Sequence, residues 1–120
     1  MSTHAALGVK MPDDSIVGCY VHYDGATMDE RIQSYLGAYT TTDLAVLITQ
    51  AQSAGGIRSF YCPAYDKGDG TVVGPPETEL MEGGDTYAID ESDFYEDHMG
   101  TYAWYLVNYE TGSIQKKDRY

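Results

Sequence analysis

Basic residues are scarce in this sequence of 120 residues, which has seven Lys and Arg residues against nineteen Asp and Glu residues. The formal net charge is therefore −12 at pH 7. A protein grips a phosphate backbone with Lys and Arg side chains. Direct binding to nucleic acid is therefore the least favoured function for this chain.

Long apolar runs are also missing, because no run approaches the roughly 18 residues that indicate a membrane-spanning helix. The first residues show no signal-peptide pattern. We therefore expect a soluble intracellular protein with no membrane partner. The two cysteines, Cys19 and Cys62, are too few for a disulfide framework, and we expect both to be small buried side chains.

Phenylalanine and tryptophan are rare too, with two Phe and one Trp residue, whereas the chain contains twelve Tyr residues. A tyrosine ring has an apolar face and a hydroxyl group that needs a partner or water. Such rings suit a half-buried core, and tyrosine is also enriched in binding hot spots. Both uses remain open at this point.

The N-terminal part of the sequence predicts an antiparallel hairpin formed by residues 3–11 and 16–23. A Pro-Asp-Asp-Ser turn joins the two β-prone runs. A turn with residues 13–14 at its tip pairs Leu7 with Tyr20 and puts both on one face. Apolar residues occur on both faces, so we expect either a strand pair that is covered on each side or a sheet with one face used for contact.

Two short helices are expected next. Apolar residues at helical spacing predict a helix over residues 28–38, with a capping box formed by Thr27 and Glu30. A second helix is expected to begin at residues 41–43, which can supply its cap, and to end at Gly55.

The remaining segments complete a prediction of one α+β domain over residues 1–120. Strands are expected at residues 57–62, 101–109 and 113–117, and a long acidic loop region at about 63–100. The predicted architecture is a mostly antiparallel sheet with both helices packed on one face.

The acidic region is the most unusual feature of the sequence. No Lys or Arg lies between Gly68 and Gln115, and residues 77–98 alone contain nine acidic residues. A solvated acidic loop is one interpretation. The other is a surface that meets a basic partner, because interleaved Tyr rings can stack against Arg, and such a surface can mimic nucleic acid. The candidate partner-binding residues are Glu82, Asp85, Tyr87, Asp90, Glu91, Asp93, Phe94, Tyr95, Glu96, Asp97 and Tyr102.

Signals for catalysis or metal binding are weak. Cys19 and His22 have zinc-like spacing, but a separation of three residues on a strand places them on opposite faces. Residues 66–77 lack most calcium-loop ligands. His22 and Asp24 could form a proton-transfer pair, although no nucleophile accompanies them. We therefore expect no catalytic residue, metal or cofactor.

Two short segments resemble a group of small tailed-phage proteins. Residues 2–4 read Ser-Thr-His where that group opens with Ser-Thr-Arg, and residues 20–25 read Tyr-Val-His-Tyr-Asp-Gly against a Tyr-Cys-His-Trp-Asp-Gly-like motif. The aromatic strand at residues 102–107 is similar to the closing hairpin of that group. The resemblance implies a phage origin and action in the cytoplasm of a bacterial host, and it transfers no functional residue.

These observations lead to one hypothesis with two alternatives. The hypothesis is a non-enzymatic phage protein that binds and inhibits a basic host macromolecule, such as a nucleic-acid-binding or anti-phage defence protein. The first alternative is a small enzyme with a His22 and Asp24 site at the end of the hairpin. The second is a structural protein whose sheet pairs with a copy of itself.

Overall fold

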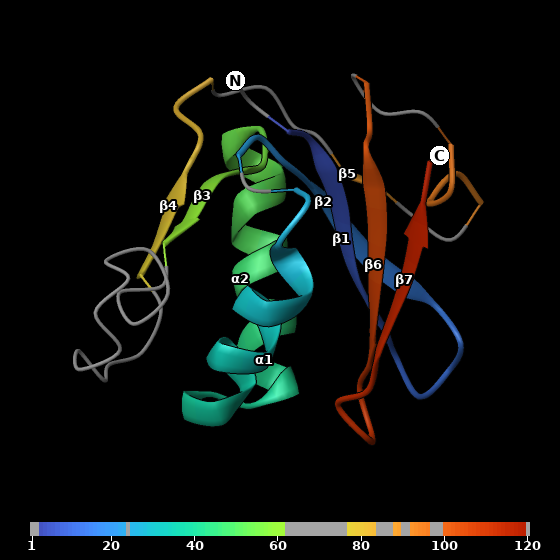
Figure 1. Cartoon of the computed structure of the whole chain (residues 1–120). Coiled ribbons are helices and arrows are strands. Elements are labelled where there is room, and N and C mark those ends of the chain that lie inside the picture. The colour runs from blue at the N-terminus through green and yellow to red at the C-terminus, as the bar shows by residue number, and fades with distance from the viewer. Residues whose placement is uncertain are drawn as a thin grey trace.

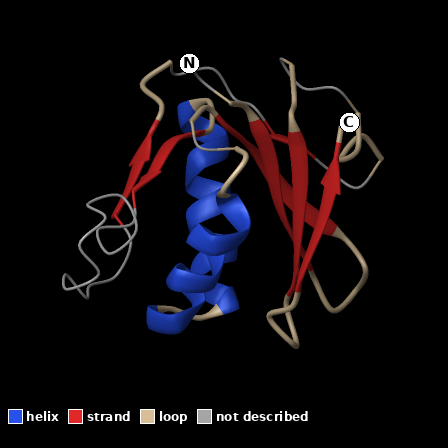
Figure 2. Ribbon diagram, in the orientation of Figure 1, coloured by secondary structure: helices blue, strands red, loops and turns tan. Residues whose placement is uncertain are grey.

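A computed structural model describes residues 3–23, 25–61, 77–83, 88–89, 92–96 and 100–119 of the chain. Two helices and seven strands lie in these residues (Figures 1 and 2). Their order along the chain is β1 (Ala5–Lys10), β2 (Ile16–Val21), α1 (Met28–Ala38), α2 (Thr41–Ala54), β3 (Ile57–Tyr61), β4 (Glu77–Leu80), β5 (Ala88–Ile89), β6 (Ala103–Asn108) and β7 (Ile114–Asp118).

The strands form one sheet in the order β4-β3-β2-β1-β6-β7, and the short β5 pairs with β2. Neighbours joined by hairpins are antiparallel, but β1 pairs with β6 and β2 pairs with β3 in parallel. The α+β class is confirmed, whereas the expected mostly antiparallel sheet is wrong because the sheet is mixed. The two helices form a crossover between β2 and β3, and such a connection allows parallel pairing.

Both helices cover one face of the sheet, as the sequence predicted (Figure 2). Leu44, Ile48 and Ala51 of α2 pack in one core cluster with inward residues of β1 and β2. These helical positions recur every three or four residues, so they share one side of α2. All three side chains are fully buried, and this packing holds the helices against the sheet.

The opposite face of the sheet, called the outer face below, has a second and smaller apolar cluster. It contains Ala6, Trp104 and Leu106 from the strands, together with Ile89 and Phe94 from the segment between β4 and β6. Side chains alternate between the two faces of a strand. Of the two alternatives for the first strand pair, the structure therefore shows the one with a cover on both sides.

The register of β1 and β2 differs by one residue from the prediction. Leu7 lies opposite Cys19, and Tyr20 lies opposite Ala6. Cys19 therefore joins Leu7 in the helix-facing core, whereas Tyr20 lies on the outer face. A slip of one residue exchanges the two faces of a strand, which explains why the predicted grouping of Tyr20 with Leu7 is wrong.

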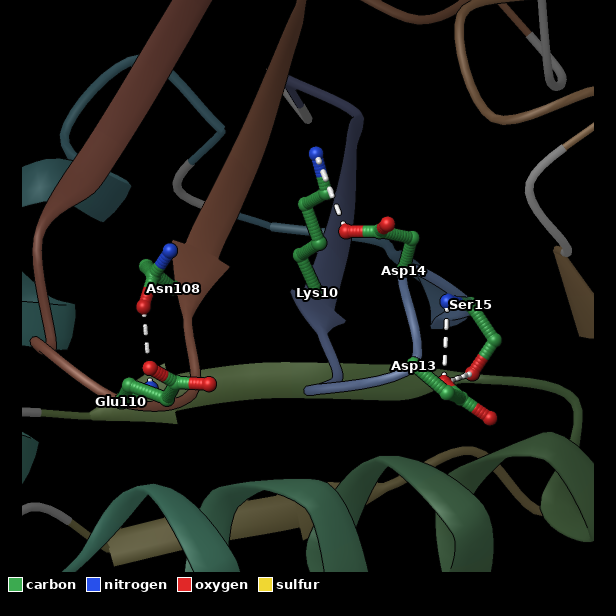
Figure 3. A network of polar contacts seen from close by, with 6 residues as sticks. All are labelled: Lys10, Asp13, Asp14, Ser15, Asn108 and Glu110. Carbon is green, nitrogen blue, oxygen red and sulfur yellow. Dashed lines mark hydrogen bonds and ion pairs between the residues drawn. The ribbon is translucent and has the colours of Figure 1, made fainter.

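The turn between β1 and β2 causes this difference. The backbone N–H of Asp14 donates to the Met11 carbonyl at 2.9 Å, and Asp14 has a positive φ of 69°. This is a three-residue loop with a left-handed third residue, instead of a two-residue tip. The Asp13 carboxylate accepts hydrogen bonds from the Ser15 backbone and hydroxyl at 3.0 and 2.6 Å (Figure 3).

Some of the predicted helix caps are present in the structure and others are not. The side chain of Thr27 makes no capping bond to α1, so the predicted box with Glu30 is not formed, and its hydroxyl instead accepts from Arg31 Nε at 3.0 Å. Helix α2 has a complete capping box, but its N-cap is Thr40. Gly55 ends α2 in the left-handed conformation, as expected.

Two strands occur inside the region that was predicted to be a loop. Strand β4 pairs antiparallel with β3, and the two-residue β5 pairs with Gly18 and Cys19 of β2. Both strands are short, and β4 has acidic residues at alternate positions instead of an apolar pattern. Residues 63–76, 84–87, 90–91 and 97–99 of the expected loop, and Cys62 before it, lie outside the described residues.

Cys19 is expected to be unreactive in the folded protein. Its side chain has no exposed surface, and burial raises the pKa of its thiol to about 12. Because the thiolate is the reacting form, iodoacetamide at pH 8 should label Cys19 at least about 100-fold more slowly in the native protein than in urea. Peptide mass spectrometry measures this rate, and rapid native labelling of Cys19 contradicts the buried position.

Candidate functional site

Two glycines make space on the outer face for the segment that precedes β6. Gly8 and Gly18 lie directly opposite each other in β1 and β2. A Cβ atom on Gly8 would lie 2.6 Å from Cε1 of Phe94, and one on Gly18 would lie 2.8 Å from the Ile89 carbonyl oxygen. Side chains at these two positions would therefore prevent the segment from reaching the sheet.

The turn at residues 92–96 is held on this face by two contacts. Phe94 is fully buried, and its ring occupies the space over Gly8. The indole N–H of Trp104 donates to the Glu96 carbonyl at 3.0 Å. Tyr95 and Glu96 are exposed, so the fixed turn presents an aromatic ring beside a carboxylate.

The exposed ring of Tyr95 contacts the ammonium group of Lys117. Its ammonium nitrogen lies 5.0 Å from the centre of the Tyr95 ring and 5.3 Å from that of Trp104. A cation within about 6 Å of a ring centre is attracted by the ring quadrupole. This surface therefore already contains a cation bound between aromatic side chains.

A cluster of histidine and tyrosine rings lies at one end of the outer face. The rings of His4 and His22 are stacked, with centres 5.0 Å apart, and the Tyr23 ring meets His22 edge-on at 4.5 Å. Nδ1 of His22 lies 2.7 Å from the hydroxyl oxygen of Tyr20. Burial lowers the pKa of His22, and the nearby charges of His4 and Arg58 lower it further.

Tyr102 connects this cluster with the rest of the outer face. Its backbone N–H donates to the His4 carbonyl at 2.8 Å, and its carbonyl accepts from the Arg119 N–H at 2.9 Å. Tyr102 precedes the inward-facing Ala103, so its ring lies on the outer side. Tyr102 is 39% exposed, so a partner can contact part of its surface.

The structure brings together part of the predicted partner-binding set. Tyr95, Glu96 and Tyr102 share the outer face and are exposed, and Asp93 is half-buried in the same turn. The ring of Phe94 is buried and is therefore not part of the exposed surface. Glu82 is exposed just after β4, at the opposite edge of the sheet from β7. Five predicted residues lie outside the described part: Asp85, Tyr87, Asp90, Glu91 and Asp97.

The sequence did not predict two features of this site. The His4 and His22 pair was missed because it depends on the register, which places residue 4 opposite residue 22 once Ala5 pairs with Val21. The contact of Lys117 with Tyr95 was missed because it depends on pairing between Trp104 and Lys117. A correct prediction of the three-residue turn between β1 and β2 would have placed His4 opposite His22.

The two remaining candidate sites are the His22 and Asp24 pair and a metal site. Asp24, the proposed partner of His22, lies outside the described residues. Within the described ranges, no group of three or more His, Cys, Asp or Glu side chains is placed to hold a metal ion. No helix in that part of the chain is long and apolar enough to span a membrane.

Comparison of the chain with protein-family models, with curated proteins and with solved structures found no match.

The replacement Gly8→Ala should loosen the turn at residues 92–96. The added Cβ meets Phe94 at 2.6 Å, so we expect the free energy of unfolding to fall by about 1–3 kcal/mol in urea titrations. The second replacement Phe94→Leu should reduce this cost, with a coupling energy of at least about 0.5 kcal/mol.

Gly37→Ala is a matched control for this experiment. A Cβ on Gly37, in the last turn of α1, has no neighbour within 4 Å. Alanine is favoured over glycine in a helix, so this variant should be more stable by up to about 1 kcal/mol. Equal costs at positions 8 and 37 contradict the proposed packing of Phe94 over Gly8.

Proposed function

We propose that this chain is a non-enzymatic binding protein that engages a basic surface of a host macromolecule and inhibits it. The observation that carries the proposal is the fixed turn, which presents exposed Tyr95 and Glu96 on the same face of the sheet as exposed Tyr102, in a chain of net charge −12. An exposed ring that needs no reordering loses less entropy on binding. Tyrosine is also enriched among residues that dominate binding energy.

Electrostatics support a basic partner. The acidic residues of the chain create a long-range negative potential, which accelerates the encounter with a cationic surface. The ring of Tyr95 already attracts the ammonium group of Lys117. The exposed part of the Tyr95 ring offers the same interaction to a partner Arg or Lys, while Glu96 and its acidic neighbours in sequence provide opposite charge.

The class of partner follows from the same chemistry. A protein that binds nucleic acid has a groove lined with Lys and Arg, and carboxylates with adjacent rings can replace the phosphates and bases. We therefore favour a host nucleic-acid-binding protein or an anti-phage defence protein. The resemblance of residues 2–4 and 20–25 to tailed-phage proteins supports a bacterial host.

Binding to such a partner should weaken with salt and with loss of the Tyr95 ring. The partner is first captured from bacterial lysate at about 50 mM salt and released at about 500 mM, where charges are screened within a few ångströms. With the purified partner, Tyr95→Ala should raise Kd by about tenfold or more, as expected for a hot spot. Glu96→Gln should mainly lower the association rate, by about two- to fivefold.

Glu110→Gln is the control for charge alone. Glu110 is exposed in the turn between β6 and β7, and its replacement removes the same charge as Glu96→Gln. We expect a change in Kd of less than about twofold. Equal effects of the two glutamine variants, together with no effect of Tyr95→Ala, mean that the partner binds elsewhere.

A further inference from the structure

A groove lies on the helix side of the molecule, away from the outer face. It is bordered by α1, α2 and β4 and has a volume of about 320 Å³. Tyr35 of α1 and Tyr39, the C-cap residue of this helix, form one wall, and Thr78 of β4 also lines it. Pockets of about this size and larger commonly hold small ligands or single side chains.

Helix α2 contributes one continuous stripe to the groove. Asp43, Val46, Leu47 and Gln50 are spaced by three, four and seven residues, so they share one side of the helix. Val46 is 52% exposed. A large apolar side chain with this exposure offers surface that a ligand can cover.

The aromatic wall suits a flat cation. The rings of Tyr35 and Tyr39 lie 4.6 Å apart at 32°, and Tyr39 is 39% exposed. A guanidinium group stacks on an exposed tyrosine face through its planar, delocalised charge. The exposed ring of Tyr39 therefore provides a stacking surface at the mouth of the groove.

The groove also contains a carboxylate in a fixed position. Oδ2 of Asp43 accepts hydrogen bonds from the backbone and the hydroxyl of Thr40, at 2.9 and 3.0 Å. This capping box fixes the carboxylate at the mouth of the groove and uses only one of its two oxygens. Among the described lining residues Asp43 is the only charged group, so the local charge favours a cation.

We propose that this groove binds an arginine side chain of a partner protein. The guanidinium group stacks on Tyr39 and faces Oδ1 of Asp43, while the methylene chain of the arginine covers Val46 and Leu47. Arginine commonly buries its apolar stem while its charged end meets a polar group. The inference goes beyond the proposed function, because it concerns a different face and stands without the acidic turn.

The test uses a small probe, N-acetyl-arginine N-methylamide, titrated into the full chain. Methyl signals of Val46 and Leu47 in carbon-proton NMR spectra report binding in the groove. N-acetyl-citrulline N-methylamide is the matched neutral probe, since it has nearly the same shape without the charge. We expect saturable shifts with the arginine probe and an affinity at least about threefold weaker for the citrulline probe.

Val46→Lys places a cation in the groove and should weaken binding of the arginine probe by at least about fivefold. Leu47 remains the reporter in this variant. Thr49→Lys is the control, because it adds the same charge to an exposed position of α2 outside the stripe. It should change the affinity by less than about twofold.

Three results overturn the proposal. The first is equal affinity for the arginine and citrulline probes, and the second is equal binding by the Val46→Lys and Thr49→Lys variants. The third is a concentration-dependent shift of the same methyl groups without any probe, which means that a second copy of the chain occupies the groove. Tyr95→Ala should leave probe binding unchanged, so failure of the outer surface and failure of the groove are separate outcomes.

Discussion

The left-handed conformation of Asp14 determines which side chains form the core and which form the candidate site. It closes a three-residue loop and thereby sets β1 against β2 in one register. In this register Cys19 faces the helices, and Tyr20 faces the outer side. A shift by one residue would bury the Tyr20 hydroxyl and the His22 ring against α2 and expose apolar side chains. The fold and the candidate site therefore both depend on the register of β1 against β2.

Local signals in the sequence were sufficient for the helices and for the last hairpin. The apolar spacing of α1 predicted its bounds of Met28–Ala38, and Gly55 marked the end of α2. These features depend on residues that are close in the chain. The parallel pairing of β1 with β6 depends on residues almost 100 positions apart, and β4 has no apolar pattern, so periodicity could not reveal either of them.

The candidate site was only partly predictable for the same reason. The abundance of acids and Tyr residues pointed to a contact surface, and Tyr95 and Tyr102 are indeed exposed. The buried position of Phe94 was not predictable, because it depends on the space above Gly8, a residue 86 positions earlier. Burial of this one ring determines that its neighbours Tyr95 and Glu96 are fixed on the sheet.

The described basic residues of the chain make contacts within the fold. Six of them lie in the described part, and each contacts an acidic group, a carbonyl oxygen or an aromatic ring of the chain: Lys10, Arg31, Arg58, Lys116, Lys117 and Arg119. Surface ion pairs of this kind add little stability. With seven basic residues against nineteen acidic ones, the chain keeps a net charge of −12. This excess charge lowers the stability of the compact state by self-repulsion, which binding of a cationic partner would relieve.

The two proposed contact regions lie on opposite sides of the central strands, since the helices cover one face and the turn at residues 92–96 covers the other (Figure 1). A short partner segment on Tyr95 therefore cannot also fill the groove beside Tyr39. Their binding energies should add independently because they share no residue. If one partner uses both regions, the second contact becomes intramolecular after the first, and two weak contacts then give a tight complex.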